Sequence, residues 1–149
     1  MTTNGMYGQF TTSQEAETSG VTIDYGEFRV KLARAGGANK KFGRVLEAKT
    51  KPFRRAIQTE TMDDARGREI LYEVYAETIV LSWETKVDGK FQSGIEPPPG
   101  SDDTKLLPTN PKNIVATFKL LPDLFDDFKE QANRVALYRE QILEEDAKN

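Results

Sequence analysis

Residues 61–83, TMDDARGREILYEVYAETIVLSW, decide how the chain is expected to fold. Apolar residues recur there with the three- and four-residue spacing of an amphipathic helix, at Ile70, Leu71, Val74, Tyr75, Ile79 and Leu81. Three glutamates follow one another at intervals of four on the opposite side, Glu69, Glu73 and Glu77. Thr61, with Asp64 three residues later, is typical of a capped helix start. The stretch therefore predicts a helix that runs to about Trp83.

The residues that follow predict two more helices. Residues 113–121 have an apolar side made of Ile114, Val115, Phe118 and Leu121. Pro122 suits the first turn of the next helix, because proline lacks the amide that would be unpaired there. That last helix has an apolar residue at every seventh position, Leu121, Phe128, Val135 and Ile142. Such a stripe forms a seam with another helix or packs on the protein's own core.

The residues before the opening stretch predict a small β element and a basic helix. Apolar and polar residues alternate over residues 21–32, which favours a β-hairpin or one bent strand. Gly36 and Gly37 end it, and Asn39 is a predicted helix cap. Pro52 predicts a kink or break near Lys51, followed by a short helix through Ile57.

The predicted fold is mainly α, with four to five helices and a small N-terminal β-hairpin or strand. It forms a single domain over residues 21–149. Residues 1–20 are polar and rich in Thr, Ser and Gly, and predict a flexible N-terminal arm. Residues 94–111 contain five of the seven prolines and predict a long surface loop, a feature that is often functional in a compact domain.

The composition excludes several classes of enzyme. The chain of 149 residues has no cysteine and no histidine, which rules out a serine–histidine triad, a cysteine nucleophile and a histidine-bound zinc centre. The adjacent acids Asp63-Asp64 and Asp126-Asp127 stand at predicted helix starts, where the helix dipole accounts for them. We expect no catalytic activity, no metal and no cofactor. No apolar run approaches the roughly 20 residues of a membrane span, so we also expect no membrane partner.

Positive charge is concentrated in residues 28–58, which hold ten Lys or Arg and one acid. The candidate basic patch consists of Lys40, Lys41, Arg44, Lys51, Arg54 and Arg55. Such a patch is typical of nucleic-acid contact, or of complementary charge within the fold or between subunits of a homo-oligomer. Binders of single strands also expose aromatic rings. Phe42 and Phe53 lie on the predicted inner side, so nucleic acid is the less favoured partner.

The glycine-rich segment ARAGGANKKF, residues 33–42, raises the question of phosphate binding. A phosphate-binding loop of the Walker type needs a wider glycine spacing and a hydroxyl after the lysine, and a dinucleotide fingerprint needs three spaced glycines. The segment has neither pattern. It predicts a strand-to-helix turn in which glycine takes a positive φ.

The order of these pieces resembles tail assembly chaperones of long-tailed bacteriophages. The resemblance covers residues 20–140, and its clearest parts are ARAGGAN (33–39), Trp83-Glu84 and LPDLF (121–125). It implies a non-catalytic protein that binds the tape-measure protein and keeps it soluble until tail-tube subunits polymerise around it. The expected location is then the host cell cytoplasm during assembly.

A chaperone of this kind needs an apolar surface for a helical client. The candidate partner-binding residues are Phe125, Phe128, Val135, Tyr138, Ile79 and Trp83. The alternative is a virion structural protein, such as a head-decoration, neck or tail component. In that case the location is the virion, and the polar arm and the proline-rich loop are tethers ordered by neighbouring subunits.

Overall fold

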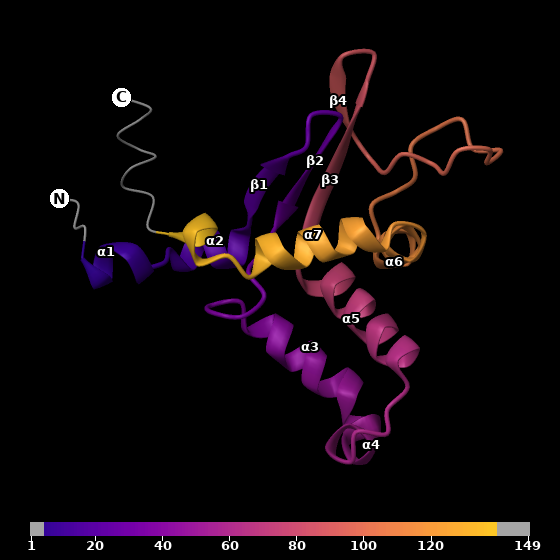
Figure 1. Ribbon diagram of the computed structural model, residues 1–149. Coiled ribbons are helices and arrows are strands. Elements are labelled where there is room, and N and C mark those ends of the chain that lie inside the picture. The colour runs from indigo at the N-terminus through magenta and orange to yellow at the C-terminus, as the bar shows by residue number, and fades with distance from the viewer. Residues whose placement is uncertain (1–4, 140–149) are drawn as a thin grey trace.

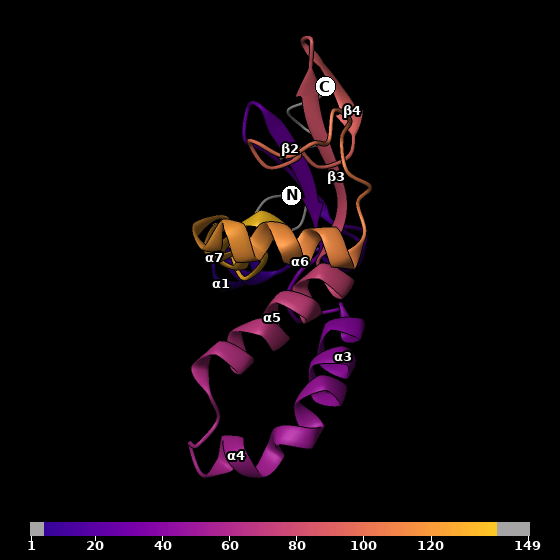
Figure 2. The same cartoon turned by 90° about the vertical axis from the view of Figure 1, so that its right-hand side faces the viewer.

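The computed structural model describes residues 5–139, and in this part the chain forms one antiparallel sheet with helices packed on it (Figures 1 and 2). The strands lie in the order β1-β2-β3-β4. They span Val21–Asp24 (β1), Phe28–Leu32 (β2), Val80–Val87 (β3) and Lys90–Ser93 (β4). The α-helices are α1 (Met6–Phe10), α2 (Gln14–Ser19), α3 (Lys40–Thr50), α4 (Arg54–Gln58), α5 (Asp64–Thr78), α6 (Pro111–Leu120) and α7 (Pro122–Ala132). Two 3₁₀ turns complete the described part, η1 (Lys51–Phe53) and η2 (Val135–Tyr138).

The prediction of a mainly helical fold is wrong, because the stretch over residues 61–83 changes from helix to strand. Helix α5 ends at Thr78, and strand β3 begins at Val80. The β-branched residues Thr78, Ile79 and Val80 favour this change. Strand β3 then pairs with β2, with Val30 opposite Trp83 and Leu32 opposite Val80. The fold is therefore α+β with a four-stranded sheet, and Trp83 belongs to a strand.

The hairpin predicted over residues 21–32 is present as β1 and β2, but it forms only half of the sheet. A tight turn joins β3 to β4, with positive φ at Asp88 and Gly89. On one face of the sheet Arg29 is paired across the strands with Glu84 at 2.7 Å and is half exposed. A sheet that is polar on one face and packed on the other is typical of antiparallel pairing.

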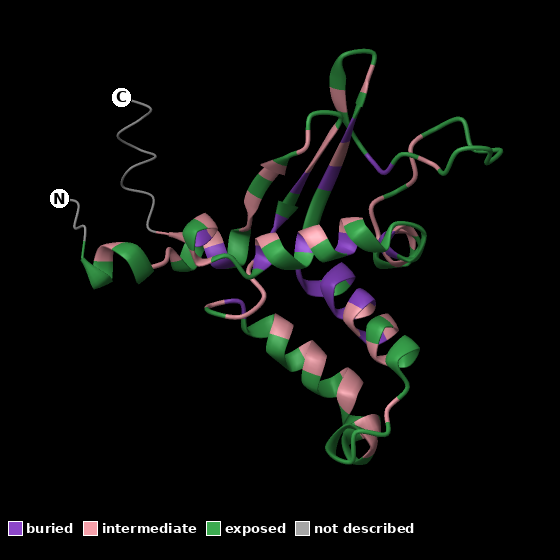
Figure 3. Ribbon diagram, in the orientation of Figure 1, coloured by how far each residue is buried: buried purple, intermediate pink, exposed green. Residues whose placement is uncertain are grey.

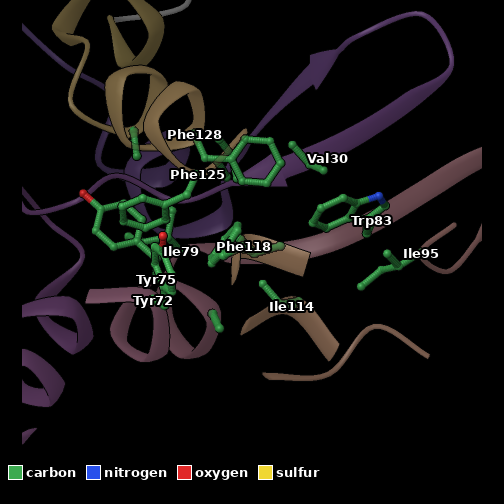
Figure 4. Packing of buried hydrophobic residues seen from close by; sticks show 14 residues of the cluster. Val30, Tyr72, Tyr75, Ile79, Trp83, Ile95, Ile114, Phe118, Phe125 and Phe128 are labelled. Atoms are coloured by element: carbon green, nitrogen blue, oxygen red, sulfur yellow. The ribbon is translucent and has the colours of Figure 1, made fainter. Parts of the chain in front are cut away.

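The core lies against the other face of the sheet, where β2 and β3 present Val30 and Trp83 (Figure 4). Aromatic rings from three helices meet there. The ring centroids are 4.6 Å apart for Tyr72 and Phe125, 5.0 Å for Phe118 and Phe125, and 5.4 Å for Trp83 and Phe128. Each such pair contributes about 0.5–1.5 kcal/mol beyond its burial. The apolar sides of α6 and α7 are therefore used within the domain.

The last helix is shorter than predicted. Helix α7 ends at Ala132, where the Asn133 side chain donates to the carbonyl oxygen of Lys129 at 2.7 Å and to the Tyr75 hydroxyl at 3.2 Å. This side chain competes with the backbone for the helix hydrogen bonds. Ile142, the last member of the predicted stripe, lies outside the described residues.

Helices α3 and α5 extend from the sheet side by side, and α4 closes the far end of this projection (Figures 1 and 2). The break predicted at Pro52 is confirmed by η1. Asn39 stands at the predicted cap position directly before α3, but its side chain does not make the expected cap bond. It is instead buried and donates to the carbonyl oxygens of Arg34 at 2.8 Å and Thr78 at 3.2 Å. Asn39 therefore fastens the start of α3 to the end of α5.

Candidate functional site: an apolar groove

An apolar groove with a volume of about 410 Å³ opens between the sheet, the proline-rich loop and the junction of α6 and α7. Three parts of the chain that are distant in sequence form it. Its lining residues are Phe28, Trp83, Thr85, Ile95, Glu96, Pro97, Pro98, Pro99, Thr117, Leu120, Leu121 and Leu124. The groove falls within the size range of ligand pockets, which is about 300–1,000 Å³.

The floor of the groove is aromatic and has no free hydroxyl at its centre. Phe28 and Trp83 are stacked there, with ring centroids 5.7 Å apart. The neighbouring Thr85 is buried, and its hydroxyl donates to the carbonyl oxygen of Gly94 at 2.8 Å. Because this hydroxyl already has a partner, the floor offers an occupant mainly apolar surface.

The proline-rich loop forms one wall. Ile95 and Leu107 pair backbone to backbone, with N–H to carbonyl distances of 2.9 and 2.8 Å, and so close the base of the loop. Pro97, Pro98 and Pro99 then stand at the groove. Proline has no amide hydrogen and a fixed φ, so this wall is stiff and donates no backbone hydrogen bonds.

The opposite wall is the corner between α6 and α7. Leu120 ends α6 and Leu121 precedes Pro122 at the start of α7; their exposed fractions are 61% and 52%. The sequence predicted Leu121 on an inward side, but the corner turns it outward. Two exposed leucines beside an apolar groove make a continuous apolar surface, which is typical of a binding site in a protein.

The structure brings only one of the six predicted partner-binding residues to this groove, namely Trp83. The side chains of Ile79, Phe125, Phe128 and Tyr138 are buried, and Val135 is half-buried. Trp83 is buried as well, with an exposed fraction of 4%, so it forms part of the floor and does not project into the groove. The Tyr138 hydroxyl donates to the Leu32 carbonyl oxygen at 3.0 Å. These residues follow the alternative in which the C-terminal stripe packs on the protein's own core, so they offer a partner little surface.

The predicted basic patch lies elsewhere, on the outer side of α3, η1 and α4. All six of its residues are exposed, and none of them forms an ion pair with another described residue (Figure 3). By contrast, Lys49 on the inner side of α3 pairs with Glu73 at 3.3 Å and Glu77 at 3.1 Å on α5. The patch and the groove are separate surfaces, and the role of the patch stays a prediction.

The glycine-rich segment holds an anion, but the anion comes from the same chain. Glu17 of α2 is buried, and its carboxylate accepts hydrogen bonds from the Arg34 guanidinium and from the Ala38 amide, the latter at 3.0 Å. Gly37 has φ +56°, and a Cβ there would lie within 3 Å of this carboxylate. The predicted strand-to-helix turn is confirmed, and its glycine also makes room for Glu17.

Glu17 also fixes part of the predicted N-terminal arm to the domain. Two backbone hydrogen bonds tie residues 13–17 to the domain. The Ser13 amide donates to the carbonyl oxygen of Tyr138 at 2.8 Å, and the Arg34 amide donates to the carbonyl oxygen of Glu17 at 2.9 Å. Helix α2 is thereby held between β2 and η2. The predicted flexibility of residues 1–20 stays a prediction, and residues 1–4 lie outside the described part.

Residues 5–139 contain neither a candidate metal site nor a helix that could span a membrane. In this part of the chain, no group of three or more acidic side chains is placed to hold a metal ion. No helix in the same range has both the length and the apolar character needed to cross a membrane.

The comparisons with known proteins place the chain among phage-related proteins. A family model described as YdaY prophage protein matches residues 37–149. Because the match covers most of the sequence, the chain belongs to the YdaY prophage protein family. The matched segment includes both walls of the groove and Trp83 in its floor, while Phe28 precedes it. Neither the curated proteins nor the solved structures gave a match.

Proposed function

We propose that this phage-related protein is a tail assembly chaperone. It binds the tape-measure protein, keeps it soluble in the host cell cytoplasm and helps tail-tube subunits to assemble around it, without catalysing a reaction. The observation that carries the proposal is the apolar groove flanked by the exposed side chains of Leu120 and Leu121. In this proposal the client contacts the groove and not the C-terminal stripe.

The groove suits a helical client with one apolar side. Such a helix places its apolar side chains into a hydrophobic groove at intervals of three and four residues. Full burial of a leucine contributes about 1.5–3 kcal/mol, so covering Leu120 and Leu121, which are already partly covered, contributes roughly half of that for each. The exposed side chain of Glu96 belongs to the lining of the groove and helps to keep the unoccupied surface hydrated.

Binding through one apolar groove also fits a chaperone that must release its client. A contact confined to one groove and its two flanking leucines is expected to fall at the lower end of interface sizes, where contacts are transient. Many weak contacts along a long client protect it from aggregation, and each is displaced when tube subunits arrive. The cycle needs no catalysis, because a chaperone that binds only the unassembled client keeps that client in solution by mass action.

The proposal is tested by co-expressing the tape-measure protein with the wild-type chain or with Leu121→Asp. The substitution places a charge at the groove without entering the core, so we expect the variant to fold and the soluble fraction of the tape-measure protein to fall. Ile57→Asp is the matched control, because Ile57 is also exposed but lies on α4, away from the groove. Equal client solubility with both variants would contradict the proposal.

A second measurement separates the chaperone from the virion structural alternative. A chaperone leaves the tail before it is complete, so we expect mass spectrometry of purified particles to find the tube subunits but not this chain. Recovery of the chain in stoichiometric amounts from finished particles would replace the chaperone role with a structural one.

A further inference from the structure

The N-terminal helix α1 exposes an unusual amount of apolar surface. Met6, Tyr7 and Phe10 have exposed fractions of 65%, 74% and 65% (Figure 3). They lie at relative positions 1, 2 and 5, so they share one side of the helix. Residues 1–14 contain no charged side chain, although 30% of the whole chain is charged. Exposed apolar residues grouped in this way indicate a contact with another surface.

Helix α1 cannot reach the apolar groove of its own chain. It lies beside η2, and the pairing of Thr12 with Arg139 and the bond from Ser13 to Tyr138 hold the segment that follows it. Figure 1 shows α1 at one side of the molecule and α6 with the proline-rich loop at the other, with the sheet and α7 between them. A contact between α1 and the groove therefore requires two copies.

We propose that α1 of one copy docks in the apolar groove of a second copy, so that the chain associates head to tail when no client is bound. The groove is the site of the proposed function, and the inference rests on that function in one respect: the client displaces α1. The contact itself depends only on the two apolar surfaces. Because they differ, each copy retains one unused surface, and the association continues or closes into a ring.

The chemistry of the two surfaces matches. An uncharged segment enters an apolar groove without burying an unpaired charge, which would be costly. The prolines of the wall have no backbone N–H groups, so they bring no unpaired amide donors into the contact. Tyr7 and Phe10 supply aromatic side chains, the kind that dominates protein contacts when it fills a pocket.

The association is expected to be weak and reversible. A helix of five residues buries less than the roughly 1,200 Å² of a standard stable interface, and association itself costs several kcal/mol. A longer client helix covers more of the exposed side chains of Leu120 and Leu121 and so outcompetes α1. Self-association then shields the groove and α1 between rounds of client binding.

The test uses two variants and their mixture. The arm variant carries Tyr7→Asp and Phe10→Asp, and the groove variant carries Leu120→Asp and Leu121→Asp; all four positions are exposed, so both chains are expected to fold, as circular dichroism checks. Analytical ultracentrifugation of the wild-type chain should show concentration-dependent association. Each variant alone should associate at least about tenfold more weakly. Ile57→Asp, the matched control, should associate like the wild-type chain.

An equal mixture of the two variants distinguishes head-to-tail docking from other contacts. The groove variant still has α1 and the arm variant still has the groove, so the mixture should form a heterodimer that grows no further. A wild-type chain that stays monomeric at high concentration would overturn the inference. Self-association of the groove variant, or a mixture without heterodimers, would overturn it as well.

Salt and client measurements separate this inference from the other surfaces. Association through the basic patch would weaken steeply as the salt concentration rises, whereas an apolar contact persists. If self-association of both the wild-type chain and the arm variant fell steeply with salt, the inference would be overturned. The arm variant should still keep the tape-measure protein soluble, because its groove is intact. Two results together would contradict this inference and leave the proposed function intact. The arm variant would self-associate like the wild-type chain, and only the groove variant would lose the ability to keep the client soluble.

Discussion

The carboxylate of Glu17 and the guanidinium of Arg34 form a buried ion pair that joins the N-terminal segment to the loop between β2 and α3. The pair is nearly sealed from solvent on the carboxylate side, and Gly37 lies against it. The glycine-rich segment that suggested phosphate binding therefore serves an internal anion.

Glu17→Gln should lower the free energy of unfolding by about 1–3 kcal/mol, because Arg34 loses a charged partner in a largely buried position. Urea denaturation followed by circular dichroism measures this change. Glu15→Gln is the matched control: Glu15 is exposed on the same helix, so its loss should change the free energy by less than about 0.5 kcal/mol. Equal effects of the two substitutions would show that the buried pair has no special weight.

Stability should fall in acid through Glu17. Burial alone would raise the pKa of this carboxyl, but the hydrogen bonds from Arg34, the Ala38 amide and Thr12 outweigh it and hold the pKa below its ordinary value of 4.5. A lowered pKa in the folded state gives stability that is complete above the unfolded-state pKa and is lost as the pH falls through the folded-state value.

The difference in unfolding free energy between the wild-type chain and Glu17→Gln should therefore be constant near neutral pH and shrink below the ordinary pKa of a glutamate. Urea denaturation of both chains across this range measures the difference. A difference that does not change in acid would mean that the carboxylate charge does not stabilise the fold.

Gly37→Ala should destabilise the protein by more than about 1 kcal/mol, because φ is +56° there and the added methyl group would meet the Glu17 carboxylate. The comparison is Gly43→Ala in the middle of α3, where a Cβ meets no atom within 4 Å. That change should stabilise by about 0.5–1 kcal/mol through helix propensity. Thermal unfolding should thus shift in opposite directions for the two variants.

Phe128→Ala and Leu121→Ala should separate the core from the groove. Phe128 is fully buried, so its truncation should cost about 3–5 kcal/mol of stability. Leu121 is half exposed, so its truncation should change stability by less than about 0.5 kcal/mol while it weakens client binding. Urea denaturation and the soluble fraction of co-expressed client give the two readouts. A large stability loss in Leu121→Ala would show that this leucine belongs to the core.

Several elements could be predicted from local signals alone. Alternation identified the hairpin of β1 and β2, Pro52 located the break after α3, and Pro122 located the start of α7. Each of these signals acts within a few residues and depends little on the rest of the chain. The turn at Asp88-Gly89 belongs to the same group.

The change from α5 to β3 could not be predicted in this way. The helical spacing of apolar residues continues through Ile79 and Leu81, so the pattern alone favours a longer helix. Strand β3 exists because it pairs with β2, which lies about fifty residues earlier, with Trp83 opposite Val30. In the structure Leu81 lies in β3 and is exposed, so the helical spacing of apolar residues no longer decides which side chains are buried at this position.

The groove escaped prediction for a related reason. Its walls come from the proline-rich loop and the α6–α7 corner, which meet only in the folded chain. The sequence did single out the loop and the LPDLF segment, but the spacing of Leu121 favoured an inward position. The exposed corner follows from Pro122, which starts a new helix immediately after it.

The backbone pairing of Ile95 with Leu107 isolates the tip of the proline-rich loop from the rest of the fold. Residues 100–105 are exposed, and their length can change without moving either partner of that pairing. A fluorescent reporter inserted at this tip would follow directly after Pro99 of the groove wall and could signal, in real time, when the groove fills and empties.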